Sequence, residues 1–174
     1  MRNLYKARGR QQSSELKSVE LRPHERETFV RDLLALRKKY PDILFAAITV
    51  NKASVPTAFR LHLNGLYNDM TRLMLLQKMG NCDYVDLTPD ARSVKVDLKH
   101  AFHDYLRTSL AEKGFETQLT TTPGESRDNL AVQFADILAS IVWSHFEYDS
   151  PLFLSIQESV SNTKLFFKQD DPTV

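Results

Sequence analysis

A helix-forming stretch near the end of the chain carries the residues that most strongly suggest chemistry. The segment 129–147 is apolar around most of its circumference, yet it has one polar stripe. At about 100° per residue, the stripe covers roughly a quarter of the helix circumference. Its members are Asn129, Gln133, Asp136, Ser140, Ser144 and Glu147. Solvated stripes usually carry Lys, Arg and Glu. We therefore interpret Asp136 as lying either at a wet edge or in a site that requires a carboxylate.

Composition limits the class of protein. A chain of 174 residues that is 42% hydrophobic predicts one domain with a real core. The net charge of +1 argues against a nucleic-acid binder that relies on bulk charge. The single cysteine, Cys82, excludes an internal disulfide framework. With no apolar run of about 18 residues and no apolar stretch behind the charged N-terminus, we expect a cytoplasmic protein outside the membrane.

Residues 1–17 form a basic N-terminal arm. The arm holds five Lys or Arg residues and one acid, Glu15. Such charge runs are commonly solvated and partly helical. The alternative is an arm that contacts phosphate groups.

Helix and strand patterns alternate along the rest of the chain. Strands separated by helices long enough for crossovers favour an α/β fold with some parallel pairing. Three strands make a narrow sheet for so much helix, so a strand is missing from the front of the pattern. We expect a single domain over 18–168 and a frayed tail over 169–174. The patterns predict helices over 23–40, 60–79, 95–113, 129–147 and 151–167, and strands over 43–50, 82–87 and 115–121.

Several short motifs, in order, resemble domain-of-unknown-function family 3800. Ser126, Asn129 and the run 132–139, which closes at Glu147, resemble that family's serine, short gap and LQLAD-like helix. Glu15-Leu16-Lys17 resembles its E-[LI]-K element, which precedes a helix like the one at Pro23. A strand followed by Lys52 and the helix with Leu66-Tyr67-Asn68 fits the middle. The resemblance covers about residues 13 to 168.

The resemblance implies an RNase H-like mixed sheet flanked by helices, with carboxylates gathered at one edge. Its chemistry would be phosphodiester cleavage assisted by Mg²⁺ or Mn²⁺, hard ions that bind carboxylate oxygens. Asp136 would be a metal ligand at the LQLAD-like position, and Glu15 a second at the E-[LI]-K position. The third would be Asp90, because α/β sites open past the carboxyl ends of strands. Asp86, inside the strand, is the alternative.

Polar residues near these acids would complete the implied site. Ser126, Asn129 and Gln133 would support the ligands or face the phosphate. Lys17 and Lys52 would contact a phosphate of a nucleic acid. If the acids share metal ions, Asp136 should lie within about 8 Å of Glu15, or of Asp86 or Asp90.

Each acid also has a structural interpretation. Asp136 fits a solvated residue or a hydrogen-bonding partner between helices. Glu15 fits a surface acid beside Lys17. Asp86 and Asp90 fit turn residues, since Pro-Asp is good turn chemistry.

The chain also departs from the family pattern. Members begin with a strand that carries an acidic DES-type motif, and this chain has no such segment. The leading strands and the first family aspartate are therefore expected to be missing. Two functions remain. One is a metal-dependent nuclease that is incomplete or inactive in this form. The other is a non-catalytic binding or assembly module, with a protein partner or a second copy covering the open sheet.

Overall fold

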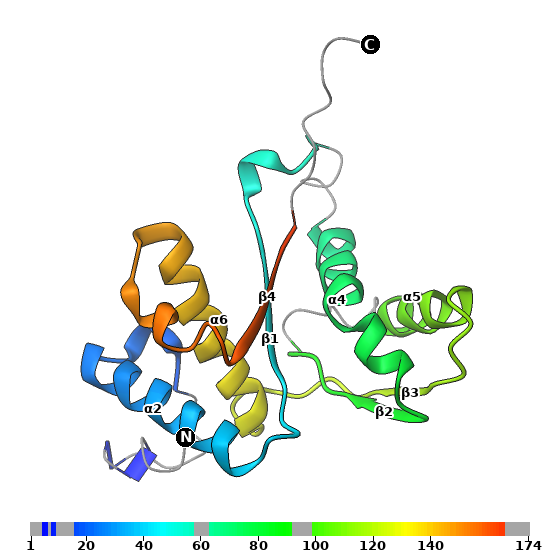
Figure 1. Ribbon diagram of the computed structural model, residues 1–174. Coiled ribbons are helices and arrows are strands. Elements are labelled where there is room, and N and C mark those ends of the chain that lie inside the picture. Colours follow the sequence, from blue (N-terminus) through cyan, green and yellow to red (C-terminus); the bar gives the residue numbers. More distant parts are fainter. Residues whose placement is uncertain (1–4, 7, 10–15, 58–62, 92–98, 166–174) are drawn as a thin grey trace. The chain divides into compact units, whose positions relative to one another are not determined.

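The computed structural model describes residues 5–6, 8–9, 16–57, 63–91 and 99–165 (Figure 1). These residues form a mixed α/β structure with four α-helices and four short strands in two two-stranded sheets. The chain divides into two compact units, the first of residues 1–47 and 124–162 and the second of residues 48–123 and 163–174. The sequence predicted one sheet in one domain. The RNase H-like arrangement of that sheet stays a prediction.

The first unit is built on α2 (Pro23–Lys39) and α6 (Leu130–Tyr148), which share one apolar core. Proline in the first turn of α2 has a fixed φ suited to a helix start, and Tyr40 caps the other end. Both bounds agree with the sequence pattern. Phe134 of α6 lies between Phe29 of α2 and Phe45, with ring centroids 4.7 and 5.5 Å away. The buried core residues of the two helices are Phe29, Val30, Leu33, Ile137, Leu138, Ile141 and Val142.

The described part of the N-terminal arm also belongs to this core. Tyr5 is 4% exposed and Leu16 is 1% exposed. Leu16 is followed by a short 3-10 helix, η1 (Ser18–Glu20), which leads into α2. The sequence predicted a solvated arm because charge dominates it. The apolar residues Tyr5 and Leu16, which the structure describes, are instead buried against the two helices, and this burial holds the described part of the arm to the unit.

The end of the chain differs from the sequence prediction. The predicted helix over 151–167 is wrong: a 3-10 helix, η4 (Pro151–Ser155), is followed by a strand, β4 (Val160–Leu165). Asp149 ends α6 in the left-handed region, with φ of 53°. Residues 159–163, SVSNT, contain β-branched side chains and short polar ones that compete for backbone hydrogen bonds, so they form helix poorly. β4 pairs with β1 (Phe45–Val50), which is half-buried along its length.

The second unit contains α4 (Leu63–Gly80), β2 (Tyr84–Leu87), α5 (Lys99–Glu112) and β3 (Gln118–Thr121). β2 and β3 are parallel, with Tyr84 opposite Gln118 and Leu87 opposite Thr121. The connection through α5 is the crossover that parallel strands require. The predicted order of helix, strand, helix and strand is thus confirmed here. The buried core residues are Leu76, Met79, Phe102, Leu106 and Leu110.

Burial alternates along this parallel pair. Val85, Leu87 and Leu119 pack against the core, whereas Tyr84 and Asp86 are exposed. Successive side chains of a strand point to opposite faces, so one face of the pair meets the helices and the other meets solvent. Asp86 therefore lies on the outer face of β2.

Gly80 is the last residue of α4 and packs against the segment that precedes β3. A Cβ atom at position 80 would overlap the ring of Phe115, which packs against the core of the second unit. Glycine is common at the ends of helices because it tolerates the conformations that end them. The structure adds a second requirement, because the absent side chain leaves room for an aromatic ring.

We expect Gly80→Ala to lower the free energy of unfolding by about 1–3 kcal/mol, because the added methyl group overpacks the Phe115 ring. Gly65→Ala is the matched control. Gly65 is exposed on the same helix, so alanine there should be neutral or stabilising through helix propensity. Urea unfolding of both variants measures the difference. Equal stability of Gly80→Ala and wild type would show that Phe115 does not constrain this position.

Candidate functional site

The predicted metal-binding carboxylates fall in different parts of the structure. Asp136 is exposed on α6 of the first unit. Asp86 is exposed on β2 and Asp90 is half-buried just beyond it, both in the second unit. Glu15 lies outside the described residues. The predicted approach of Asp136 to Glu15, Asp86 or Asp90 therefore stays a prediction. Among the residues that the structure describes, no three His, Cys, Asp or Glu side chains form a group that could hold a metal ion.

The predicted supporting residues have structural partners at the start of α6. The side chain of Asn129 caps the helix by accepting hydrogen bonds from the backbone N–H groups of Ala131 (2.9 Å) and Val132 (3.2 Å). Gln133 is 1% exposed, and its amide nitrogen donates to the carbonyl oxygen of Ser126. Ser126 is buried as well. These contacts fix the loop that leads into α6.

The oxygen atom of the Gln133 amide binds the N-terminal arm. Its Oε1 accepts a hydrogen bond from the hydroxyl group of Tyr5. The same hydroxyl oxygen accepts from the backbone N–H of Leu16 at 3.1 Å. A buried amide whose donors or acceptors lack hydrogen-bond partners lowers the stability of the fold. Gln133 thus joins the arm to α6 through one satisfied polar chain.

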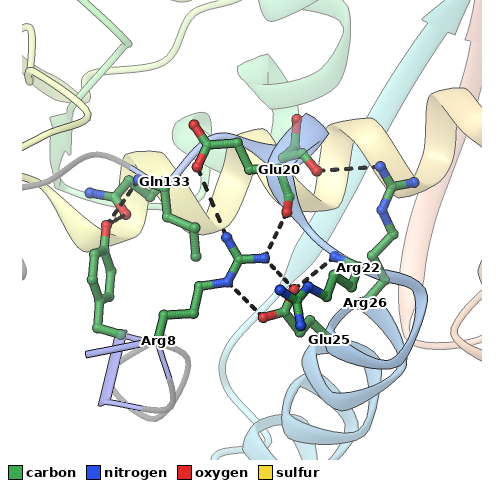
Figure 2. A network of polar contacts seen from close by, with 9 residues as sticks. Arg8, Glu20, Arg22, Glu25, Arg26 and Gln133 are labelled. Carbon is green, nitrogen blue, oxygen red and sulfur yellow. Dashed lines mark hydrogen bonds and ion pairs between the residues drawn. The ribbon is translucent and has the colours of Figure 1, made fainter. Parts of the chain in front are cut away.

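A second polar network joins the arm to α2 (Figure 2). Both carboxylate oxygens of Glu25 accept hydrogen bonds from Arg8, one from Nε at 2.6 Å and the other from Nη2. The backbone N–H of Arg22 donates to Glu25 at 2.7 Å. Arg8 also donates to the carbonyl oxygen of Glu20 at 2.6 Å. This is the bidentate geometry in which guanidinium–carboxylate pairs are strongest.

The environment of Glu25 favours its ionised form. The hydrogen bond from Arg8 is the largest effect, and it lowers the pKa of the Glu25 carboxyl to about 2 although burial acts in the opposite direction. The same hydrogen bond raises the pKa of Arg8. With its lone pairs committed to Arg8 and Arg22, Glu25 serves to hold the arm and the start of α2 together.

A polar network of the second unit ties α4 to α5. One carboxylate oxygen of Asp69 accepts from Arg72 Nη2 and from the hydroxyl group of Tyr105, both at 2.8 Å. Burial, followed by the hydrogen bond to Asp69, raises the pKa of Tyr105. Lys17 and Lys52, the predicted phosphate contacts, are exposed in the first and second units respectively.

The most distinctive surface of the first unit is the outer side of α6. Trp143 is 51% exposed and Phe146 is 41% exposed, although both are large apolar residues on a helix whose opposite side forms the core. Ala139 and Ala135 are exposed about one and two turns before Trp143, respectively. Their spacing places all four on one side of the helix. We call this surface the α6 outer face, and define it as Ala135, Asp136, Ala139, Trp143, Phe146 and Glu147.

The charged side chains of the segment that carries this face are acidic. Residues 128–163 contain no Lys or Arg, whereas they contain five acids. Two of these acids, Asp136 and Glu147, border the apolar residues of the α6 outer face. An apolar strip with an acidic border favours a partner that is apolar and basic.

The sequence pattern located α6 but missed its outer face. The sequence predicts a helix over 129–147 that is apolar nearly all round, and it indicates the polar stripe as the place of the candidate site residues. In the structure the border of the core runs through that stripe, because Gln133 and Ser144 are buried while Asp136 and Glu147 are exposed. The signal for the outer face was the apolar character of the side opposite the core. The Arg8–Glu25 pair had a weaker signal, an acid in the first turn of a helix.

No protein-family model, curated protein or solved structure matches the chain. The resemblance to domain-of-unknown-function family 3800 accordingly stays a prediction. Within the described residues, no helix is both long and apolar enough to cross a membrane.

We expect Glu25→Gln to lower the free energy of unfolding at pH 7 by about 1–3 kcal/mol, because Arg8 loses an ionised acceptor. The lowered pKa of Glu25 means that its carboxylate stabilises the fold above the unfolded-state pKa of about 4.3, and that this contribution is lost as the pH falls toward about 2. The stability difference from wild type should therefore shrink between about pH 5 and pH 2.

Urea unfolding of both proteins across this pH range measures the effect. Glu27→Gln, at an exposed position of the same helix, is the control and should change stability little. A stability difference that is the same at every pH would contradict the assigned role of the Arg8–Glu25 pair.

Proposed function

We propose that the chain is a non-catalytic binding or assembly module that docks a helical partner on the α6 outer face. The observation that carries the proposal is the exposure of Trp143 and Phe146 beside two exposed alanines, in a segment (residues 128–163) without Lys or Arg. Isolated exposed apolar residues are common on protein surfaces. A row of them along one helix is typical of an interaction surface.

The side chains of this face suit helix packing. Ala135 and Ala139 are small, so a second helix can approach α6 closely at their level. Trp143 and Phe146 project further and can serve as anchors, since aromatic residues dominate the binding energy of many interfaces. Phe146 is supported on one side by Phe153, with ring centroids 6.3 Å apart. The face thus has a low part at the two alanines and a projecting part at the two aromatic residues.

The acidic border defines the chemistry of the partner. Asp136 and Glu147 stand near opposite ends of the face, about 16 Å apart along the helix axis at about 1.5 Å per residue. A helix with an apolar stripe flanked by Lys or Arg would cover the aromatic residues and pair with both acids. This is recognition of an amphipathic helix by a complementary surface.

We expect a synthetic amphipathic helix of Leu and Lys to bind the chain, because it offers both the apolar stripe and the basic flanks. Trp143→Ser should weaken binding at least about tenfold, the loss typical of an aromatic anchor. Fluorescence anisotropy of the labelled peptide measures both affinities.

Two controls make this test specific. A peptide with Glu in place of Lys should bind more weakly, because its charge matches that of the face. Leu44→Ser changes a residue of the same unit that is 62% exposed but does not belong to the α6 outer face, and it should leave binding unchanged. Equal binding by wild type and Trp143→Ser would reject the α6 outer face as the docking surface.

A metal-dependent nuclease of RNase H-like type is the second candidate. One contact supports it: Leu16, the residue after Glu15, is tied through the Tyr5 hydroxyl to Gln133, three positions before Asp136. Leu16 of the E-[LI]-K element and the LQLAD-like helix are thereby held in one unit, which supports this candidate. Mg²⁺ or Mn²⁺ would bind through Asp136 with Glu15. A nucleic acid would be the substrate, and Lys17 and Lys52 would contact its phosphates.

If these acids hold Mn²⁺, the fold should gain about 1 kcal/mol at metal concentrations several times the dissociation constant. We expect this gain only in the millimolar range, with little or no nuclease turnover. Asp136→Asn should remove the gain because it takes away one anionic ligand, whereas Glu147→Gln on the same helix should keep it. Melting curves with and without Mn²⁺ measure the effect. An equal response of Asp136→Asn and wild type would exclude Asp136 from a metal site.

A further inference from the structure

We infer that the partner of the α6 outer face is a second copy of this chain, which presents the exposed side of its α2. This inference rests on the proposed function, because it needs the α6 outer face to be a docking surface. It goes further by naming the occupant. The argument comes from charge, from the spacing of side chains along the two helices, and from the symmetry of the resulting contact.

The exposed side of α2 has the chemistry that the α6 outer face requires. Arg31, Leu34, Ala35 and Lys38 are all exposed, and their spacing of three, four and seven positions places them on one stripe. Leu34 is 38% exposed although it is a large apolar residue. We call these four residues the α2 outer face. It is an apolar centre with a cation at each end.

The two faces match along their lengths. Arg31 and Lys38 are about 10 Å apart along α2, and Asp136 and Glu147 are about 16 Å apart along α6. With Leu34 placed between Ala139 and Trp143, each cation lies within a few ångströms of the level of one acid. The long side chains of arginine and lysine can span that difference. In this arrangement the two apolar centres are in contact, and each of the two acids pairs with a cation.

Charge also favours this contact over a symmetric contact between two α6 outer faces. If α6 met α6 of a second copy, Asp136 and Glu147 of both chains would gather in a segment that has no Lys or Arg. Like charges that meet at an interface repel each other and weaken association. Contact between the α6 outer face and the α2 outer face instead brings opposite charges together. The acidic border therefore favours the unequal pairing.

The unequal pairing has a consequence for assembly. Each chain carries one α6 outer face and one α2 outer face, so a bound copy still has one face of each kind to offer. Such heterologous contacts form rings or open chains instead of stopping at a two-fold dimer. The average mass should rise steadily with protein concentration, and added salt should lower it through screening of the charge pairs.

Sedimentation equilibrium of three proteins tests the inference. Wild type should associate beyond the dimer. Trp143→Ser, which loses the α6 outer face, and the double variant Arg31→Glu/Lys38→Glu, which loses the α2 outer face, should each associate at least about tenfold more weakly. An equimolar mixture of the two variants should form a dimer and stop there, because each supplies the face that the other lacks.

Two further variants serve as controls. Arg107→Glu/Lys113→Glu makes the same charge change at exposed positions of the second unit and should leave association unchanged. Asp136→Lys/Glu147→Lys combined with Arg31→Glu/Lys38→Glu reverses both faces and should restore association. Because every substituted residue is exposed, melting curves should show that these variants stay folded.

Two results would overturn the inference. One is a wild-type chain that stays monomeric at all accessible concentrations. The other is association that Trp143→Ser abolishes while Arg31→Glu/Lys38→Glu leaves it intact, which would indicate contact between two α6 outer faces. In either case, binding of the Leu and Lys peptide that depends on Trp143 would leave the proposed function standing. Loss of that binding as well would reject both.

Discussion

α6 carries apolar side chains around most of its circumference, but the core of its unit meets only one side of it. Ile137, Leu138, Ile141 and Val142 are covered by α2 and by the segments that pack beside it. Trp143 and its neighbours on the α6 outer face are left in solvent. Burial of apolar surface is the main source of stability in folding and in association. The excess apolar surface of this helix therefore links the fold to the proposed docking function.

The polar networks of the first unit serve the same helix pair. Gln133 holds the N-terminal arm to α6 through Tyr5, while Glu25 holds it to α2 through Arg8. Buried amides and charges of this kind are costly unless they are fully paired, so they specify one position for the arm. With the arm fixed, the inner sides of both helices are covered. Their outer faces, one acidic and one basic, stay on the surface.

Local signals in the sequence predicted much of the fold. Pro23 indicated the start of α2, and alternation over 115–121 indicated β3. The helix between the two strands indicated that β2 and β3 are parallel. The strand at 160–165 was missed: its residues disfavour a helix locally, but only the pairing with β1 makes the segment a strand, and the sequence near it does not reveal that distant partner. The division into two units was missed for the same reason. Among the site residues, Asp136 is exposed at the edge of the predicted stripe, and its role as a metal ligand stays a prediction. The exposure of Trp143 depends on which side of α6 the core covers.

The central claim is that the α6 outer face is an open docking surface, and Trp143 reports on it directly because it is the only tryptophan of the chain. The most direct measurement is acrylamide quenching of its fluorescence over a range of protein concentrations. The account predicts efficient quenching in dilute solution and growing protection as the concentration rises. Protection that is already complete in dilute solution would contradict it, because the chain itself would then cover the face.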